Sequence, residues 1–366
     1  MNSQGTTVLI MAAGTGGHVF PALSIAECLK EQGIRTEWLG TRQGMENRLL
    51  ENSGIPIHPV SVKGLKGKGL VRLLLAPFMM LIALTQSMQV ILRVKPNCVL
   101  GMGGFVSGPG GLATKLLGKK LLIHEQNAVP GFTNRMLSKI SNKVFEAFPQ
   151  TFKSSDKVMF TGNPIREDIA ALHKVERRIS NGENPLRILV LGGSQGALAI
   201  NEIVPKVIAQ WDSATRPALV HQAGKATLEQ TVGCYKKAGL ELSENIKVQA
   251  FINDMAEVYQ WADLVICRSG ASTVSELAAA GLPSILVPYP HHSDRQQSHN
   301  AKWLADAGAA IQLEQVDLNT DALKNILLGL QENRSQLAEM SNKAKSQAIC
   351  NADELIARQC LEIANG

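Results

Sequence analysis

Short apolar runs alternate with longer helix-forming segments along most of the chain. In the first half, the runs that predict strands cover 8–13, 36–39, 56–62, 97–100, 120–123 and 143–147, with helical segments at 21–32, 44–53 and 131–139. In the second half, predicted strands cover 187–191, 218–222, 246–250, 264–267, 284–288 and 310–312, with helices at 197–210, 272–280, 294–307 and 320–331. This alternation predicts an α/β protein built on doubly wound parallel sheets with helices on both faces.

Two glycine-rich turns divide the chain into similar halves. The apolar runs that precede them begin at residues 8 and 188, a separation typical of whole domains rather than of a short repeat. The segment 160–164 interrupts the alternation and predicts the boundary between the halves. We therefore expect an N-terminal domain over 1–165 and a C-terminal domain over 166–340. The last piece, 341–366, belongs to an amphipathic helical stretch over 335–365, which either closes its own domain or crosses back to the first.

Composition narrows the class of partner. The chain has 366 residues, 45% of them hydrophobic and 19% charged, which is typical of a globular protein large enough for two cores. The net charge of +6 suits partners that carry phosphate. Aromatic residues make up only 4%, which argues against the stacking surfaces that bind single-stranded nucleic acid. We expect no nucleic-acid partner.

The cysteines and the N-terminus indicate the compartment. None of the six cysteines forms a Cys-x-x-Cys pair, and they are expected to be free, buried thiols of a reducing compartment. Residues 1–7 contain neither a basic region nor an apolar signal core, so we expect no export signal.

The segment 70–95 is the most apolar part of the chain. Its uninterrupted run, Leu73 to Leu84, is shorter than the roughly 20 residues that a membrane-spanning helix needs, and Pro77 lies within it. Four basic residues stand just before the run: Lys63, Lys66, Lys68 and Arg72. An apolar helix beside basic residues fits a protein that rests on an anionic membrane surface. An ordinary buried helix is the alternative.

The first glycine turn, Gly14-Thr15-Gly16-Gly17, opens a predicted helix and suits a phosphate group. It lacks the third glycine of a dinucleotide fingerprint, although Glu37 stands about where a ribose-binding acid would be. His18 follows at the start of the helix, whose positive end disfavours the protonated ring, so His18 could accept a proton. A capping or packing histidine is the alternative.

The segment Cys267–Glu276 combines the end of a strand, a turn of small residues and the start of a helix. Small residues let a diphosphate approach the free N–H groups of that helix. Glu276 lies one turn further, where its carboxylate could accept hydrogen bonds from both hydroxyls of a ribose. Thr273 and Glu276 also have the spacing of a helix capping box, which is the structural alternative.

Paired glutamines, Gln296 and Gln297, begin a later helix and suit sugar hydroxyls, because each amide offers a donor and an acceptor. Three neighbouring histidines match no common zinc spacing, and the chain has no Asp-x-Asp for a divalent ion. We therefore expect no metal, with the charge of a leaving group met by helix ends, Arg166 and hydroxyls such as that of Ser194.

Seven motifs together carry a family resemblance. They are Gly14-Thr-Gly-Gly-His-Val-Phe-Pro-Ala22, Gly101-Met-Gly-Gly-Phe-Val-Ser-Gly-Pro-Gly-Gly111, His124-Glu-Gln-Asn127, Gly162-Asn-Pro-Ile-Arg166, Gly192-Gly-Ser-Gln-Gly-Ala197, Cys267-Arg-Ser-Gly-Ala-Ser-Thr-Val-Ser-Glu276 and Asp294-Arg-Gln-Gln297. In this order they resemble the MurG family, bacterial N-acetylglucosaminyltransferases of glycosyltransferase family 28 that convert lipid I to lipid II in peptidoglycan synthesis. The resemblance covers nearly the whole chain.

The resemblance implies a GT-B fold, with two Rossmann-like domains facing a deep cleft and a last helix that returns to the first domain. It implies inverting, metal-independent transfer from UDP-N-acetylglucosamine to the C4 hydroxyl of the muramyl sugar of lipid I, without a cofactor. It also implies a peripheral protein on the cytoplasmic face of the inner membrane, with possible contacts to other cell-wall and division proteins.

The resemblance also assigns residues. Ile252 would hold uracil and Glu276 the ribose, and the sugar would be read by Asn127, Gln296 and Gln297. The diphosphate would be held by Arg166, Ser194 and the helix start at Ala271, Ser272, Thr273, Val274 and Ser275. Three residues of the first turn would line the cleft, contact the donor and face the acceptor pyrophosphate: Thr15, Gly16 and Gly17. The acceptor would bind at Gly14, Gly103, Gly104 and Glu125. His18 is the candidate general base, with Glu125 as a second candidate.

Two other functions remain open at this point. A UDP-N-acetylglucosamine 2-epimerase of the same architecture would need catalytic carboxylates in the cleft and no membrane surface. A non-catalytic scaffold that binds nucleotide sugars would keep Glu276 and Gln296 but tolerate the loss of His18.

Overall fold

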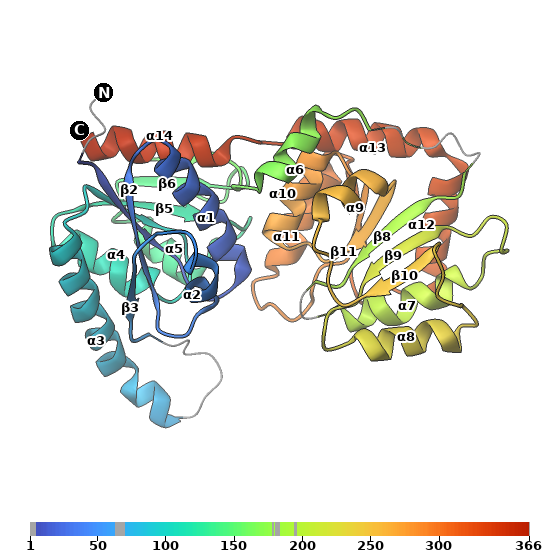
Figure 1. Ribbon diagram of the computed structural model, residues 1–366, viewed down its shortest axis with the longest axis horizontal. Coiled ribbons are helices and arrows are strands. Elements are labelled where there is room, and N and C mark those ends of the chain that lie inside the picture. The colour runs from blue at the N-terminus through green and yellow to red at the C-terminus, as the bar shows by residue number, and fades with distance from the viewer. Residues whose placement is uncertain (1–4, 63–69, 178, 180–183, 194–195, 366) are drawn as a thin grey trace. The chain divides into compact units, whose positions relative to one another are not determined.

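The computed structural model describes residues 5–62, 70–177, 179, 184–193 and 196–365. The chain divides into two compact units (Figure 1). The first unit consists of Met1–Ile165 together with Asn351–Gly366, and the second of Arg166–Cys350. The chain therefore leaves the first unit once and re-enters it for its last helix.

The first unit contains a seven-stranded parallel sheet in the order β3-β2-β1-β4-β5-β6-β7. Its strands are β1 (Thr7–Met11), β2 (Arg35–Thr41), β3 (Ile57–Val60), β4 (Cys98–Gly101), β5 (Lys120–Glu125), β6 (Lys143–Glu146) and β7 (Val158–Phe160). The predicted parallel sheet is confirmed. The sequence pattern missed β7, because three residues are too few to show a period and a Thr-Gly-Asn-Pro turn follows them.

Helices cover both faces of this sheet: α1 (Gly16–Glu31), α2 (Met45–Leu50), α3 (Leu70–Val94), α4 (Ser107–Leu116), α5 (Phe132–Leu137) and α14 (Ala352–Asn365). Figure 1 shows α14 beside α1, and its Ile356 and Cys360 are buried in the same core as Val8 of β1. The helical stretch expected over 335–365 is confirmed, but it is not one continuous helix. It is two helices, α13 (Arg334–Gln347) and α14, separated at 348–351, and residues 341–350 lie in the second unit.

Helix α3 is continuous over 25 residues, with Pro77 inside it rather than at a break. Ala76, Ala83 and Ile91 are buried on one face, which packs against α4. Other apolar side chains of α3 are exposed, namely Phe78, Met80, Leu81, Ile82 and Leu92. The stretch Ala76–Val94 is long and apolar enough to cross a membrane, judged by length and composition alone. The uninterrupted apolar run from Leu73 to Leu84 therefore underestimated the length of the apolar helix.

The second unit repeats the plan with a six-stranded parallel sheet in the order β10-β9-β8-β11-β12-β13. Its strands are β8 (Arg187–Leu191), β9 (Ala218–Gln222), β10 (Ile246–Gln249), β11 (Leu264–Cys267), β12 (Ser284–Leu286) and β13 (Ala310–Gln312). Its helices are α6 (Glu167–Ala171), α7 (Leu198–Ile208), α8 (Leu228–Lys237), α9 (Met255–Trp261), α10 (Ala271–Ala280), α11 (Gln296–Asp306), α12 (Thr320–Glu332) and α13, with a 3-10 turn at Leu172–Lys174.

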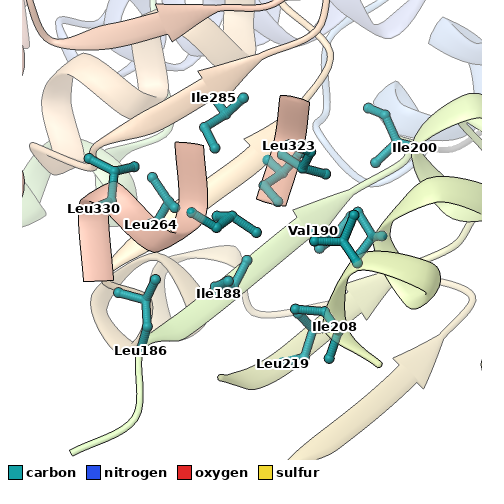
Figure 2. Packing of buried hydrophobic residues seen from close by; sticks show 14 of the residues in the cluster. Leu186, Ile188, Val190, Ile200, Ile208, Leu219, Leu264, Ile285, Leu323 and Leu330 are labelled. Carbon is teal, nitrogen blue, oxygen red and sulfur yellow. The ribbon is translucent and has the colours of Figure 1, made fainter. Parts of the chain in front are cut away.

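The core of this unit lies between the sheet and the helices α7 and α12 (Figure 2). Ile188 and Val190 of β8 pack there with Leu323 of α12 and Ile200 of α7. The sequence did not predict α8 or α9, because α8 mixes Thr, Val and Gly with charged residues and α9 has only seven residues.

Both sheets reverse their strand order at one point, between β1 and β4 in the first unit and between β8 and β11 in the second. In doubly wound sheets, ligands bind at the carboxyl ends of the strands that flank this point. The turns that follow β1, β4, β8 and β11 carry four of the seven motifs found in the sequence.

Candidate functional site

The glycine turns after β1 and β4 pack against each other in the first unit. Gly14, Gly103 and Gly104 all have positive φ, at 102°, 95° and 79°. A Cβ on Gly104 would stand only 2.1 Å from the backbone oxygen of Ala13. All three positions therefore favour glycine for their backbone conformation, and Gly104 also requires it for the close approach of the two turns.

His18 is half-buried in the first turn of α1, with Thr15 as the N-cap residue. Its Nδ1 lies 3.1 Å from Oε1 of Gln126. A Cβ on Gly103 would come within 3.1 Å of the same side of the ring, so the turn after β4 covers this side. Within the described residues, Nε2 of His18 has no hydrogen-bond partner, and it is the ring nitrogen available to a ligand.

The carboxylate of Glu125, at the end of β5, is buried and fully engaged. Oε1 accepts hydrogen bonds from the backbone N–H and the side-chain amide of Asn127, at 3.0 and 3.2 Å. Oε2 accepts from the backbone N–H of Gly131 and the amide of Asn134, at 3.0 and 2.9 Å. This carboxylate ties down the loop between β5 and α5, and the arrangement favours a structural role over proton transfer.

Glu37 does not stand where a dinucleotide would need it. It lies within β2 rather than near its end, and it is buried between Arg35 at 2.6 Å and His58 at 2.6 Å. Both of its oxygens are occupied by these side chains, so Glu37 stabilises the β2–β3 edge of the sheet.

A cavity of about 620 Å³ opens beside the first glycine turn. Its exposed lining is mainly apolar and includes Met79 and Ile82 of α3 and Phe105 after β4. The remaining lining residues are Gly14, Thr41, Arg42, Gln43, Gly44, Val60, Ser61 and Val62. The cavity joins the glycine turn to the exposed apolar side chains of α3.

In the second unit, α10 begins at Ala271 after the N-cap residue Gly270. Thr273 therefore lies inside the helix, and the alternative of a Thr273–Glu276 capping box is wrong. The first N–H groups of α10 have no partner within the helix and can donate to an anion. The hydroxyl of Ser272 is buried at this end without a hydrogen bond among the described residues. Ser194, which is also predicted to bind the diphosphate, lies outside the described residues.

Glu276 points back toward α9, where Oε2 accepts a hydrogen bond of 2.9 Å from the hydroxyl of Tyr259. Burial raises the pKa of the Glu276 carboxyl above its ordinary value, while the bond from Tyr259 and the charge of Arg166 lower it. Arg166, the N-cap residue of α6, is thus close enough to act on this carboxyl electrostatically. Tyr259 itself is fully buried, and burial raises the pKa of its hydroxyl well above the ordinary value.

Gln297 is held against the turn that precedes α10. Its side-chain Oε1 accepts from the backbone N–H of Tyr289 at 2.9 Å, and its backbone oxygen accepts from the Ser269 hydroxyl at 2.8 Å. Among the described residues, the amide nitrogen of Gln297 has no hydrogen-bond partner, so it can donate to a ligand. Gln296 precedes it at the start of α11, after Arg295, a non-glycine residue with a φ of 50°.

Ile252 lies between β10 and α9, and its side chain is buried. Asp254 caps α9 by accepting a hydrogen bond of 2.8 Å from the N–H of Glu257. Among the described residues, the backbone groups of Ile252 have no hydrogen-bond partner, which leaves them available to a base.

The predicted residues therefore form two groups. In the second unit, the structure brings together the start of α10 (Ala271, Ser272, Thr273, Val274 and Ser275), Glu276, Arg166 and Gln297. In the first unit, it brings the turn after β1, with His18, beside the turn after β4; the residues are Thr15, Gly16, Gly17, His18, Gly103 and Gly104. Asn127 lies in the loop that is bound to Glu125. The sequence analysis assigned no role to Tyr259 or Gln126, whose contacts with Glu276 and His18 no local pattern reveals. Within the described residues, no cluster of three His, Cys, Asp or Glu side chains is arranged to hold a metal ion.

Comparison with known sequences identifies the family. Residues 8–146 match the N-terminal domain of glycosyltransferase family 28, and residues 187–356 match its C-terminal domain. The chain is 47% identical over 366 residues, all of both chains, to a Pseudomonas putida protein named UDP-N-acetylglucosamine–N-acetylmuramyl-(pentapeptide) pyrophosphoryl-undecaprenol N-acetylglucosamine transferase. It is 46% identical to a Marinobacter nauticus protein of the same name, over 98% of each chain.

One solved structure agrees with this family, and a second shares the fold. A crystal structure of MurG from Acinetobacter baumannii has 41% sequence identity and a TM-score of 0.82, over 98% of this chain and 99% of that one. A crystal structure named as a putative UDP-N-acetylglucosamine 2-epimerase from Listeria monocytogenes has a TM-score of 0.67 at 18% identity, over 96% and 94% of the two chains. That likeness concerns the fold alone.

Proposed function

This chain belongs to glycosyltransferase family 28, and we propose that it transfers N-acetylglucosamine from UDP-N-acetylglucosamine to the C4 hydroxyl of the muramyl sugar of lipid I. Lipid I is undecaprenyl-pyrophosphoryl-MurNAc-pentapeptide, and the product is lipid II. The names of relatives that match over the full chain support this choice.

One observation carries the donor site: the Glu276 carboxylate stands one turn behind the open start of α10 with one oxygen bound to Tyr259. The second oxygen has no hydrogen bond among the described residues and suits the hydroxyls of a ribose. The diphosphate then meets the N–H groups of Ala271–Thr273, with the charge of Arg166 nearby. Uracil would bind the backbone groups of Ile252, and Gln296 and Gln297 would bind the sugar hydroxyls.

In the reaction, Nε2 of His18 takes the proton of the acceptor hydroxyl as its oxygen attacks the anomeric carbon. The bond to the diphosphate breaks on the opposite face, which converts the α-linked donor to a β-1,4 product. The leaving diphosphate gains negative charge, and the start of α10 and Arg166 stabilise it. Glu125 is the weaker candidate for the base, because its four hydrogen bonds occupy both oxygens.

For the acceptor, Gly14, Gly103 and Gly104 offer backbone close to the pyrophosphate, and the apolar cavity beside them leads to α3. The exposed apolar residues of α3 would rest in an anionic membrane surface on the cytoplasmic side, with the protein bound peripherally. Lys63, Lys66 and Lys68 lie outside the described residues, and the side chain of Arg72 is likewise not described. Contacts with other cell-wall and division proteins would follow from this location.

The test uses purified full-length protein with labelled UDP-N-acetylglucosamine and a short-chain lipid I analogue. We expect a disaccharide product that a β-specific hexosaminidase cleaves. Conversion of the donor to its C2 epimer would identify an epimerase, and binding of the donor without turnover would identify a scaffold. Either of these two outcomes would contradict the proposal.

A further inference from the structure

We propose that Gln126, backed by His124, is a positioning residue that keeps the proton of neutral His18 on Nδ1 and so leaves Nε2 free to accept one. The catalytic consequence rests on the proposed role of His18 as base, whereas the position of the proton can be measured without any reaction.

The argument starts at His124, which is completely buried in β5. Burial, more than any other influence, lowers the pKa of His124 to about 4, so its ring is neutral at physiological pH and carries one proton. Its Nε2 lies 3.0 Å from the backbone oxygen of Gly162, which can only accept. The proton of His124 is therefore on Nε2, and Nδ1 is an acceptor.

The orientation of the Gln126 amide follows from this. Its Nε2 lies 3.0 Å from Nδ1 of His124 and 2.9 Å from the backbone oxygen of Met102, both of which are acceptors. A reversed amide would bring two carbonyl oxygens together at Met102 and leave His124 without a donor. Gln126 is also buried, so water cannot compensate such a reversal.

The last step concerns His18. With its nitrogen committed, Gln126 presents Oε1 to Nδ1 of His18 at 3.1 Å, and an amide oxygen can only accept. Nδ1 of His18 must therefore carry the proton, and Nε2 holds the lone pair. The backbone of Gly162, the rings of His124 and His18, and the Gln126 amide between them form one chain of hydrogen bonds with a single consistent direction. Gln126 and His124 act through His18 and touch no reacting atom themselves.

The first measurement is the ring-nitrogen NMR spectrum of wild-type protein labelled with ¹⁵N-histidine, at about pH 8, where an ordinary imidazole is neutral. The chain has eight histidines, and the spectrum of His18→Gln assigns the signals of His18. We expect a protonated Nδ1 and an unprotonated Nε2. A wild-type His18 with its proton on Nε2 would overturn the proposal, whatever the enzyme does.

The second measurement uses Gln126→Met, which keeps the length of the side chain but removes the amide. We expect a mixture of His18 tautomers and a kcat at least about tenfold lower, with the KM for UDP-N-acetylglucosamine unchanged, because only part of the protein holds a free Nε2. The matched control is Gln86→Met, which removes a partly buried hydrogen bond that the Ser61 N–H donates to Gln86 Oε1 in the same unit. It should leave the His18 tautomer unchanged.

These outcomes separate the inference from the function on which it rests. A fall in kcat with an unchanged tautomer would make Gln126 merely structural and refute the proposal. An unchanged kcat with a mixed tautomer would refute its catalytic part. Loss of transfer in wild-type protein, with the expected spectrum, would contradict the proposed function alone. If Gln126→Met does not fold, the wild-type spectrum still decides.

Discussion

The hydroxyl of Tyr259 donates a 2.9 Å hydrogen bond to Oε2 of Glu276, and this bond fixes the carboxylate that the proposed ribose site needs. Tyr259 is buried in α9, and Glu276 lies in α10, so the two helices together hold the carboxylate in one orientation. A carboxylate held in this way offers its second oxygen to a ligand without first losing rotational freedom.

We expect Tyr259→Phe to weaken UDP binding about tenfold, because the change removes one hydrogen bond to the charged, half-buried carboxylate of Glu276. Isothermal titration calorimetry measures the effect. The matched control is Tyr235→Phe, which removes another buried hydroxyl of the same unit, 2.9 Å from His221. An equal loss of affinity in both variants would contradict a specific role for Tyr259.

Glu276→Gln should separate stability from binding. Because burial raises the pKa of the folded carboxyl, the folded protein binds this proton more tightly than the unfolded chain, and stability rises as the pH falls through that pKa. At neutral pH the charged form therefore costs stability, so the variant should have a higher Tm without ligand and a UDP affinity lower by about tenfold or more. An unchanged affinity for UDP would refute the ribose role.

The affinity for UDP should also depend on pH through Glu276. The ribose hydroxyls donate to the carboxylate, so affinity should fall as acid protonates it, at a pH above the ordinary range of glutamate. In Tyr259→Phe this fall should move to higher pH, because the lost hydrogen bond lowered the pKa. The phosphate of UDP also takes up protons, so the pH dependence of UDP affinity is measured in Glu276→Gln as a correction. If the wild-type protein had the same pH profile of UDP affinity as this variant, the prediction would be contradicted.

Glu125→Gln tests the second candidate base. The change leaves at least one of four donors without a partner, so we expect the free energy of unfolding to fall by about 1–3 kcal/mol. The kcat of the remaining folded protein should change little. Urea unfolding measures the change in stability, and steady-state kinetics measure kcat. The control for both is Glu27→Gln, which changes an exposed glutamate of α1. A loss of kcat of about a thousandfold with unchanged stability would make Glu125 the base.

Gly104→Ala should disrupt the first-unit turns. Its φ of 79° is strained for alanine, and the added Cβ would meet the Ala13 backbone oxygen at 2.1 Å. We expect a fall in the free energy of unfolding of about 2 kcal/mol or more, measured by urea unfolding. Gly108→Ala is the control, because its Cβ would meet its nearest atom, in the Thr133 side chain, only at 3.6 Å. Equal losses in both variants would contradict the assigned cause.

The membrane surface is tested on α3. Phe78 and Leu81 are 67% and 58% exposed, and we expect Phe78→Ser with Leu81→Ser to weaken binding to anionic vesicles about tenfold or more. Val316→Ser, which changes an exposed apolar residue of the second unit, is the control for sedimentation with vesicles. Vesicle binding unchanged in the α3 double variant would exclude this face.

The sequence by itself determined the strands other than β7, the parallel sheets and the places of the glycine turns, because hydrophobic period and turn chemistry are local properties. Strands β8, β9 and β11 have the bounds that the pattern predicts. Only the tertiary structure decided that Tyr259 binds Glu276, that Gln126 binds His18 and that the oxygens of Glu125 are occupied. These contacts depend on the direction in which side chains point after packing, and the contact between His18 and Gln126 joins residues 108 positions apart. No local pattern along the chain records such a direction.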